Sequence, residues 1–567
     1  MKVSHLNVRD FRSLHRVDIG LTQICALVGP NNAGKSNLLL ALRKVLEPDW
    51  LTKASFDQAD IYGRDPNVDI EIELHLDPPL EYKRFKGGPP AVIAGFSVRY
   101  TRYKVGFQKG EPRLEKKCFG KGGKDVYVPK TAPKPGEQLD FEALIGIPDE
   151  IRSQVPLVYI GVNRSVRQHL PGARNSLLRP LFEDINKDFR DPSNTVVVKE
   201  PDGRQDQKKP RAEAFEELIN QAMGLLRTKD FVELEESVKR NALHQLGFDP
   251  IADADKFDFF FSPFDSLDFY KSLSITIREH GFEIDATELG GGFQNSIVLA
   301  MLQAFEERRK KGAIFLIEEP EMFLHPQMQR SLYKTIREIG RTNQVVYSTH
   351  SPYFVAIPEF DEVLLLRRGS DGTNIQSSNL PTDAKRQEKL RKEMDPERSE
   401  LFFAERLLLV EGDTEKLALP EYAIRLGIDL DRAGATIVEV GGKRNLMEFV
   451  GIAASFGIPT GVLYDEDSRE FKDDRSGEKA YNAELDGLAR SDGTVQVWCA
   501  QKNYEHQLRT ALGEAAFQEM SQRFPRTTKP VKARLIAAEN TPVPELVKRV
   551  VRWLGGVTVE DDAQELK

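Results

Sequence analysis

One short segment constrains the fold of this chain more than any other, because it reads Gly29-Pro-Asn-Asn-Ala-Gly-Lys-Ser36. It follows the apolar run Ile24–Val28, which predicts a buried strand, and it precedes Asn37–Val45, which predicts a helix. A glycine-rich turn between a strand and a helix is the context in which this pattern forms a phosphate-binding loop. The sequence therefore predicts an α/β nucleotide-binding domain.

The chemistry of this phosphate loop (29–36) follows from its residue types. Glycines let backbone N–H groups close around phosphate oxygens, Lys35 adds a positive charge at the β- and γ-phosphates, and the Ser36 hydroxyl can ligate Mg²⁺. We expect ATP to be the cofactor. The residues expected to bind it are Gly29, Asn31, Asn32, Ala33, Gly34, Lys35, Ser36 and Asn37.

A second apolar run, Ala313–Ile317, ends in Glu318-Glu319-Pro320-Glu321. One carboxylate at a strand end can hold the magnesium shell, and the next can orient water for attack on the γ-phosphate. We assign Glu318 to the metal and Glu319 to catalysis. The usual Asp at the first position is Glu318 here, a longer side chain that can reach the metal directly or through water. Taken alone, the run is also compatible with a plain strand terminus.

Two further segments carry ATP-site chemistry. Gly290-Gly-Gly292 precedes a helical pattern and would present N–H groups to an anion. Ser348-Thr-His350 follows the apolar strand Gln344–Tyr347 and places an imidazole at a sheet edge. Each alone is compatible with an ordinary loop.

Together and in this order, the four segments resemble the ABC-type ATPases of the SMC and RecF-like group. In that family the glycine signature of one subunit completes the ATP site of another, so the resemblance implies that hydrolysis requires a dimer. It also implies that Gly290, Gly291 and Gly292 contact the nucleotide and that His350 is catalytic. Asp10-Phe-Arg12 and Asn163-Arg164 are weaker matches, to the adenine-side and glutamine-loop positions.

A separate set of acids follows two later strand patterns. Glu411 ends the run Arg406–Val410, and Asp465 and Asp467 follow the run 461–464. Alternate residues of an extended segment point to the same side, and open α/β sheets build their sites where parallel strands end. Carboxylates that converge there would repel one another, so a divalent cation is expected. For Asp413 and Thr414, helix capping is the alternative interpretation.

The Glu411-Gly-Asp-Thr-Glu415 and Asp465-Glu-Asp467 arrangement resembles the Toprim domain of topoisomerases, primases and some nucleases. An ABC-type ATPase followed by a Toprim domain resembles the OLD (overcoming lysogenization defect) nucleases, which include the nuclease subunit of the Gabija phage-defence system. The resemblance implies ATP-binding dimers or higher assemblies that nick or cleave DNA with Mg²⁺ or Mn²⁺.

The same resemblance implies roles for four more residues. Glu415 and Glu505 are expected to join Glu411, Asp465 and Asp467 as metal ligands, and the last three are also expected to be the catalytic carboxylates. Lys529 is expected to stabilise the transition state as a cation near the scissile phosphate, and Lys532 is the alternative.

At 567 residues the chain is long enough for about three domains. We expect the first part of an ABC-type ATPase domain at 1–168, a helical insertion that serves dimerisation at 169–250, the second part of the ATPase at 251–380, a polar linker at 381–400 and an α/β Toprim domain at 401–567. Residues 108–137 are rich in Lys and Arg, which favours a solvated loop over a DNA-facing one.

Charge and cysteine content bound the partners and the compartment. The formal net charge is −8, so contact with DNA must come from local basic patches or bound metal. The three cysteines, Cys25, Cys118 and Cys499, have no paired spacing, which fits a reducing cytoplasm better than a disulfide framework. No run approaches the roughly 18 apolar residues of a membrane span, so no membrane contact is expected.

These features predict an ATP-regulated, divalent-metal-dependent DNA endonuclease in phage defence or DNA processing. Its expected partners are DNA, at least one further copy of the chain and, because such neighbours accompany part of the family, a helicase encoded nearby. The alternative is a non-nucleolytic, ATP-driven DNA clamp or repair factor of the SMC/RecF-like class, whose Toprim-like unit only binds DNA.

Overall fold

The computed structural model describes most of the chain. The described residues are 1–47, 51–132, 138–162, 164–173, 176–198, 207–246, 248–249, 251–253, 255, 266–279, 281–308, 312–355, 360–378, 393–467 and 476–557. They divide into two compact units, one of Met1–Val162 with Gly312–Lys567 and one of Asn163–Lys311. Most of the predicted linker 381–400 lies outside the described residues, and the predicted domain limits stay a prediction.

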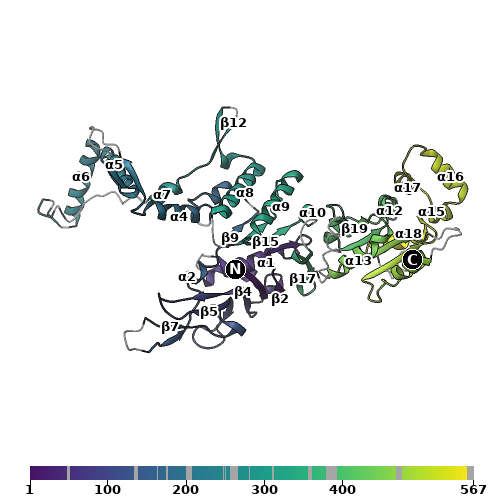
Figure 1. The fold of residues 1–567 in the computed structure, drawn as a ribbon, viewed down its shortest axis with the longest axis horizontal. Coiled ribbons are helices and arrows are strands. Elements are labelled where there is room, and N and C mark those ends of the chain that lie inside the picture. The colour runs from purple at the N-terminus through teal and green to yellow at the C-terminus, as the bar shows by residue number, and fades with distance from the viewer. Residues whose placement is uncertain are drawn as a thin grey trace. The chain divides into compact units, whose positions relative to one another are not determined.

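An antiparallel sheet opens the first unit (Figure 1). Its strand order is β2-β1-β4-β5-β6, with β1 (Lys2–Phe11), β2 (Leu14–Gly20), β4 (Ile70–Tyr82), β5 (Ala91–Arg102) and β6 (Pro112–Phe119). Every second side chain of β4 from Ile70 to Leu76 is buried, as the alternating sequence predicts.

A second, mostly parallel sheet carries the nucleotide-site residues. Its order is β17-β16-β3-β15-β14-β9, with β3 (Ile24–Val28), β9 (Leu157–Ile160), β14 (Ile314–Glu318), β15 (Gln344–Thr349), β16 (Val363–Gly369) and β17 (Gly372–Ser377). Helix α1 (Lys35–Leu46) contacts strands of both sheets and buries Leu38, Leu39 and Leu42 in their common core. Helices α2 (Asp149–Arg152), α9 (Pro326–Ile339) and α10 (Pro352–Val355) complete this part.

The described part of the basic segment 108–137, residues 108–132, contains more regular structure than a solvated loop. It contains β6 and β7 (Tyr127–Pro129), which pairs with β8 (Phe141–Ala143). The expectation of a loop is wrong here because Cys118 and Phe119 are buried against the sheet.

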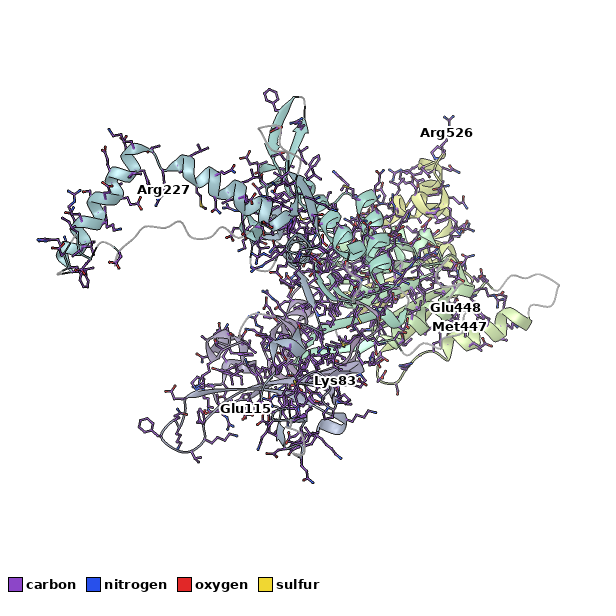
Figure 2. The ribbon with its side chains drawn as sticks, turned by 60° about the vertical axis from the view of Figure 1, so that its left-hand side comes forward. Lys83, Glu115, Arg227, Met447, Glu448 and Arg526 are labelled. Carbon is purple, nitrogen blue, oxygen red and sulfur yellow. The ribbon has the colours of Figure 1, made fainter. Side chains whose placement is uncertain are left out.

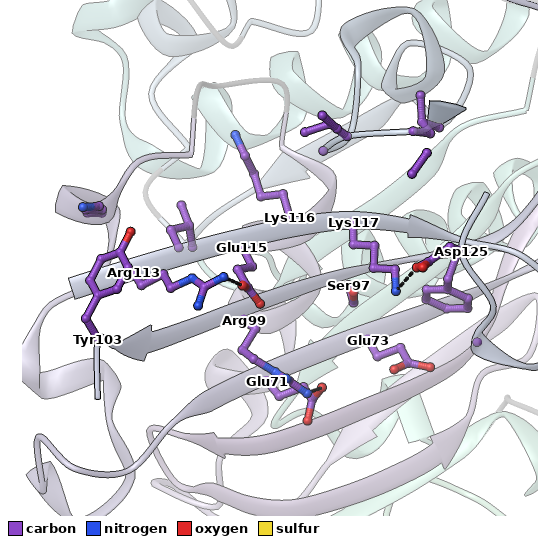
Figure 3. A pocket seen from close by; sticks show the side chains of 18 residues that line it. Glu71, Glu73, Ser97, Arg99, Tyr103, Arg113, Glu115, Lys116, Lys117 and Asp125 are labelled. Carbon is purple, nitrogen blue, oxygen red and sulfur yellow. Dashed lines mark hydrogen bonds and ion pairs between the residues drawn. The ribbon is translucent and has the colours of Figure 1, made fainter. Parts of the chain in front are cut away.

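The basic side chains of β6 border an open groove of about 820 Å³ on the sheet (Figure 3). Arg113 pairs with Glu115, and Lys117 pairs with Asp125 at 2.5 Å. Arg99 from β5 pairs with Glu71 at 2.5 Å. Acids therefore neutralise these three cations, and with Lys53 and Lys116 the lining of the groove carries five cations against four acids. It offers only a small excess of positive charge to a phosphate backbone.

The second unit, which includes the described part of the helical insertion predicted at 169–250, is mainly helical. Its helices are α3 (Val166–His169), α4 (Arg179–Phe189), α5 (Arg211–Leu226), α6 (Lys229–Gln245), α7 (Ser266–Lys271) and α8 (Gly291–Arg308). Two antiparallel hairpins, β10 (Thr195–Val198) with β11 (Gln207–Pro210) and β12 (Thr276–Glu279) with β13 (Phe282–Asp285), interrupt them. Arg227 follows α5 (Figure 2). It pairs with Glu235 of α6 at 2.9 Å.

A third sheet forms the C-terminal part of the chain. Its four parallel strands run in the order β19-β18-β20-β21, with β18 (Arg406–Val410), β19 (Ala435–Glu439), β20 (Thr460–Asp465) and β21 (Val495–Ala500). The helices are α12 (Asp413–Arg425), α13 (Leu446–Ser455), α14 (Ser476–Asp486), α15 (Tyr504–Leu512), α16 (Glu514–Arg523), α17 (Lys529–Ala538) and α18 (Glu545–Leu554). Strands β18 and β20 are direct neighbours, so Glu411 and Asp465 lie at the same sheet edge, as predicted.

The α/β fold class is confirmed, with the nucleotide-binding sheet first and the parallel C-terminal sheet after it. Among the helices of the described residues, none has both the length and the hydropathy that crossing a bilayer demands.

Candidate ATP and metal sites

The phosphate loop turns sharply between β3 and α1. Gly29 and Gly34 have φ angles of 147° and 107°, a region that L side chains rarely adopt. A Cβ atom on Gly29 would lie 2.1 Å from the carbonyl oxygen of Leu366 in β16. The loop therefore requires glycine at this position both for its backbone conformation and for the close approach of β16.

Lys35 lies inside this loop with only 5% of its surface exposed. Its Nζ donates to the carbonyl oxygens of Gly29 at 2.8 Å and Pro30 at 2.9 Å. Burial lowers the pKa of Lys35 to about 8, and the charges of Glu319 and Glu321 oppose that shift. Hydrogen bonds to two carbonyl groups of the phosphate loop thus hold the Lys35 ammonium inside that loop.

Hydrogen bonds to neighbouring segments brace the loop. Asn37 Nδ2 donates to Ser13 Oγ at 2.8 Å, and Ser13 Oγ lies 2.7 Å from Thr373 Oγ1. The Thr373 hydroxyl donates to the carbonyl of Ala33 at 2.9 Å. Asn37, predicted to bind the cofactor, thus engages Ser13, and its role in nucleotide binding stays a prediction.

Glu318 ends β14 beside the start of α1. It is hydrogen-bonded to Ser36 and to Tyr159 of β9, and both bonds partly offset the effect of burial, which raises the pKa of Glu318. The guanidinium of Arg43 stacks 4.2 Å from the Tyr159 ring. The two predicted Mg²⁺ ligands, Ser36 and Glu318, are therefore in direct contact.

Glu319 and His350 lie side by side at the ends of β14 and β15. His350 Nε2 is 3.4 Å from Glu319 Oε1, and the Glu319 N–H donates to the Ser348 carbonyl at 3.0 Å. Burial and the charge of Lys35 lower the pKa of His350, which favours its neutral form. Glu319 has φ 43°, a strained backbone conformation of the kind that concentrates at functional sites.

Glu321 holds the chain that carries His350. Its Oε1 accepts hydrogen bonds from the Thr349 hydroxyl and the His350 N–H, both at 2.7 Å, and from the Ser351 N–H at 3.1 Å. This role was not predicted from the sequence. The feature of the sequence that could have indicated this role is the Glu-Pro-Glu spacing, in which one rigid residue separates Glu319 from Glu321.

The predicted glycine signature belongs to the second unit. Gly291 and Gly292 open α8, and Gln294 of this helix donates to the carbonyls of Thr287 at 3.0 Å and Leu289 at 2.8 Å. Arg164 donates to Asn295 at 3.0 Å, whereas Asn163 lies outside the described residues. Contact of Gly290, Gly291 and Gly292 with nucleotide stays a prediction.

The acidic site comprises Glu411, Glu415, Asp465, Asp467 and Glu505, the five predicted metal ligands of the C-terminal part. Glu411 Oε1 accepts the Asp465 N–H at 2.7 Å, and Asp465 Oδ1 accepts the Tyr504 N–H at 2.8 Å. Asp467, just beyond β20, has φ 55°. Backbone N–H groups therefore orient the two strand-end carboxylates.

Burial raises the pKa values of the inner carboxyls of the acidic site. The pKa of Glu411 rises to about 7, that of Glu415 to about 8 and that of Asp465 to about 6. The charge of Asp465 adds to the rise at Glu415, and that of Asp467 adds to the rise at Asp465. The three groups are close enough to repel one another as carboxylates.

Lys529 lies near this cluster at the start of α17. Its Nζ is 3.8 Å from Glu505 Oε1, and its charge opposes the rise in pKa at Glu415 and Asp465. Lys532, one turn further along, is half-buried and has no ion pair with an acid among those described. The geometry favours Lys529 over Lys532, and its catalytic role stays a prediction.

Lys443 is a cation of this site that sequence reasoning missed. It follows β19 in the segment Gly441-Gly-Lys443, and its Nζ donates to the Asp465 carbonyl. The detectable signal was the pair of glycines directly before a lysine at the end of a predicted strand.

The chemistry of the acidic site fits a hard divalent cation, since the site offers carboxylate oxygens whose mutual repulsion a cation would relieve. Within the described ranges, however, no three His, Cys, Asp or Glu side chains are grouped so as to hold a metal ion as they stand. The assignment of the five carboxylates as metal ligands therefore stays a prediction, which requires their side chains to turn inwards.

Comparison with known families identifies both parts of the chain. Residues 1–355 match a model described as "AAA ATPase domain", and residues 402–467 match one described as "Overcoming lysogenization defect protein-like, TOPRIM domain".

Three curated relatives are similar to this chain over most of its length. An OLD nuclease of Thermus scotoductus is 28% identical over 82% of this chain and 82% of its own length. The Old nuclease of Escherichia phage P2 is 24% identical over 82% of this chain and 77% of its own. Endonuclease GajA of Bacillus cereus is 24% identical over 83% of this chain and 76% of its own.

Proposed function

The chain belongs to the AAA ATPase domain family and carries an OLD-like TOPRIM domain, and from this premise we propose that it is an ATP-regulated, divalent-metal-dependent DNA endonuclease. Nucleotide and divalent metal use are implied by the two domains, and ATP and Mg²⁺ or Mn²⁺ are the species that we propose. Three relatives named as nucleases, each matched over more than four-fifths of this chain, support a nuclease function.

One observation carries the nuclease proposal, the convergence of Glu411, Glu415 and Asp465 at the carboxyl edge of β18 and β20. Burial, and after it the charges of neighbouring acids, raise the pKa values of these acids, and a bound cation would favour their charged forms. A divalent cation, when bound, supplies Lewis acidity and a more acidic water molecule.

The remaining chemistry belongs to the protein's own groups. The N–H groups of Asp465 and Tyr504 each hold one carboxylate oxygen, of Glu411 and of Asp465 respectively, at the strand ends. Lys529, tied to Glu505 at the rim, supplies a positive charge that would stabilise the extra negative charge on a phosphodiester in the transition state.

The residues of the ATP site support regulation of DNA cleavage by a separate reaction, the hydrolysis of ATP. Lys35 would neutralise the nucleotide phosphates, and Ser36 with Glu318 would hold the magnesium ion of the nucleotide. Glu319 would orient the attacking water, and a neutral His350, next to Glu319, would contact the γ-phosphate side of the site. Hydrolysis in this arrangement would require the glycine signature 290–292 of a second copy.

Exposed leucines on helices of the second unit, Asn163–Lys311, support assembly into a dimer or a higher oligomer. Leu218, Leu225 and Leu226 of α5 and Leu234 of α6 are each at least 62% exposed, which is unusual for leucine on a helix with no partner. A helicase encoded nearby and a role in phage defence, which the GajA relative suggests, complete the proposal.

The direct test is nicking of supercoiled plasmid by the purified full-length protein, with Mg²⁺, Mn²⁺, ATP or EDTA added singly and together. We expect nicked or linear product with metal and none with EDTA, restored by excess metal. ATP is expected to change the rate. Plasmid that stays supercoiled under every condition, together with ATP-dependent DNA binding, would support the non-nucleolytic clamp instead.

A further inference from the structure

Lys443 stands out among the buried charged groups because no part of the proposed reaction uses it. It is only 8% exposed, and burying an ammonium is costly unless it is paired. Its partners are the carbonyl of Asp465, the carboxylate of Asp467 at 3.5 Å and that of Glu478 at 3.8 Å. All three belong to β20, the residues just after it, or the neighbouring helix α14.

The segment that carries Lys443 is built to deliver it there. Gly441 and Gly442 have φ angles of 75° and 112°, so the chain turns back at the end of β19 in a way that L residues rarely follow. The Gly442 N–H donates to the carbonyl of Glu411 at 2.8 Å, and the Tyr481 hydroxyl donates to that of Lys443 at 3.1 Å. The Gly441–Lys443 segment thus binds the main chain at both Glu411 and Asp465.

This geometry joins the two strand ends that carry the inner carboxylates. The Lys443 ammonium also lies 5.2 Å from the centre of the Tyr464 ring, a cation–π contact with a residue of β20. Asp467 has a strained φ of 55°, and its carboxylate forms an ion pair with Lys443.

We propose that Lys443 is a positioning residue of the acidic site, which fixes the end of β20 and serves as the internal counter-ion of Asp467. It acts through Asp465 and Asp467 and does not touch DNA. The inference rests on the metal-dependent nuclease function proposed above and assigns Asp467 a partner within the protein besides the cation.

Two opposing effects follow when Lys443 is replaced by methionine. Loss of one positive charge beside the acids favours binding of a divalent cation, since like charges no longer repel. Loss of the hydrogen bond to Asp465 and of the ion pair to Asp467 frees the strand end, so the bound cation no longer lies in the productive position. Binding and cleavage therefore change in opposite directions, which a general loss of structure would not produce.

The experiment compares full-length wild type, Lys443→Met, Lys443→Arg and Lys479→Met. Lys479 is exposed on α14 next to Glu478, so its replacement removes the same charge without touching the strand end. Binding is measured with Mn²⁺ alone by calorimetry, cleavage by single-turnover plasmid nicking at saturating Mn²⁺, and folding by thermal melting.

We expect Lys443→Met to bind Mn²⁺ at least as tightly as wild type and to nick DNA about 10–100-fold more slowly, the scale for losing a group that orients a ligand. Lys479→Met should match wild type in both. Lys443→Arg keeps the charge but not the compact ammonium, so it should bind Mn²⁺ like wild type and cleave at least several-fold more slowly. If Lys443→Met does not melt cooperatively and is therefore not folded, the comparison of Lys443→Arg with wild type tests the proposal instead.

Wild-type cleavage by the folded variants would overturn the inference, and so would weaker Mn²⁺ binding with a full rate at saturating metal. Either result, with an active wild type, leaves the nuclease proposal intact. A wild type that binds no Mn²⁺ and leaves DNA uncut would instead overturn both proposals.

Discussion

Glu319 and Glu321 are two residues apart, yet their surroundings give them different tasks. Glu321 Oε1 is saturated by three hydrogen bonds from the Thr349–Ser351 segment, whereas Glu319 faces His350. Glu319→Gln should therefore bind ATP normally and hydrolyse it about a hundredfold more slowly, because water loses its general base. ATP binding and phosphate release measure the two effects, and light scattering shows whether an ATP-bound dimer accumulates.

Normal turnover in Glu319→Gln would point to Glu318 as the catalytic carboxylate. Glu321→Gln is the matched control, since it should disturb the position of His350 and lower the melting temperature as well as the rate.

The inner carboxyls of the acidic site predict how stability depends on pH. Burial raises the pKa of Glu415 to about 8 and that of Glu411 to about 7, from an ordinary 4.5. These groups bind more protons in the folded than in the unfolded chain, so their contribution to stability is complete below about pH 4.5 and is lost as the pH rises through 7 to 8.

In EDTA we expect the melting temperature of the wild type to fall between about pH 5.5 and pH 8.5, and Mn²⁺ to restore it at the higher pH. Glu415→Gln should flatten this dependence. If the melting temperature of Glu415→Gln fell as steeply with pH as that of the wild type, Glu415 would not be the source of the pH dependence.

Lys529 and Lys532 lie on the same helix and differ in their relation to the acidic site. Lys529→Ala should slow cleavage about a hundredfold with little change in DNA affinity, because the charge acts in the transition state. Lys532→Ala is the control and should cleave at the wild-type rate. Weaker, less salt-dependent binding by Lys529→Ala with unchanged single-turnover cleavage would make Lys529 a phosphate contact only.

At the scale of elements, the phosphate loop depends on the approach of β16. Gly29→Ala would place a methyl group 2.1 Å from the Leu366 carbonyl, whereas Gly63, with a φ of 64°, has nothing within 4 Å of such a group. We expect Gly63→Ala to cost about 1–2 kcal/mol of unfolding free energy for backbone strain alone. Gly29→Ala should cost more and should lose ATP binding, as measured by chemical denaturation and nucleotide titration.

The strands that carry the sites could be predicted because each is a short apolar run that ends in chemistry-bearing residues. Glu318, Glu411 and Asp465 all lie at strand ends where the pattern placed them. Strand β6 could not be predicted, since its charged residues pair with near neighbours in the chain, Arg113 with Glu115 and Lys117 with Asp125, and only Cys118 and Phe119 indicate burial.

The partners of individual side chains could not be predicted from the sequence pattern, because the tertiary fold brings them together. Lys443 and Asp465 are 22 residues apart, and only the parallel order β19-β18-β20 brings their segments together. Glu321 was equally ambiguous, because the hydrogen bonds that distinguish it from Glu319 come from the end of a different strand.

At the scale of the whole molecule, the chain has two chemical sites in separate sheets, and each has its own buried lysine. Lys35 lies among the acids that follow β14, and Lys443 lies among those that follow β20. Each activity should therefore be removable by mutation without destroying the other site.

The most direct test of this account measures ATP hydrolysis and plasmid nicking in Asp465→Ala and Lys35→Ala, at saturating Mn²⁺ and with folding checked by thermal melting. Asp465→Ala should hydrolyse ATP at the wild-type rate and leave supercoiled plasmid uncut. Lys35→Ala should hydrolyse no ATP and still bind Mn²⁺ at the acidic site. Nicking by Asp465→Ala, in a preparation free of other nucleases, would contradict the assignment of DNA cleavage to the acidic site.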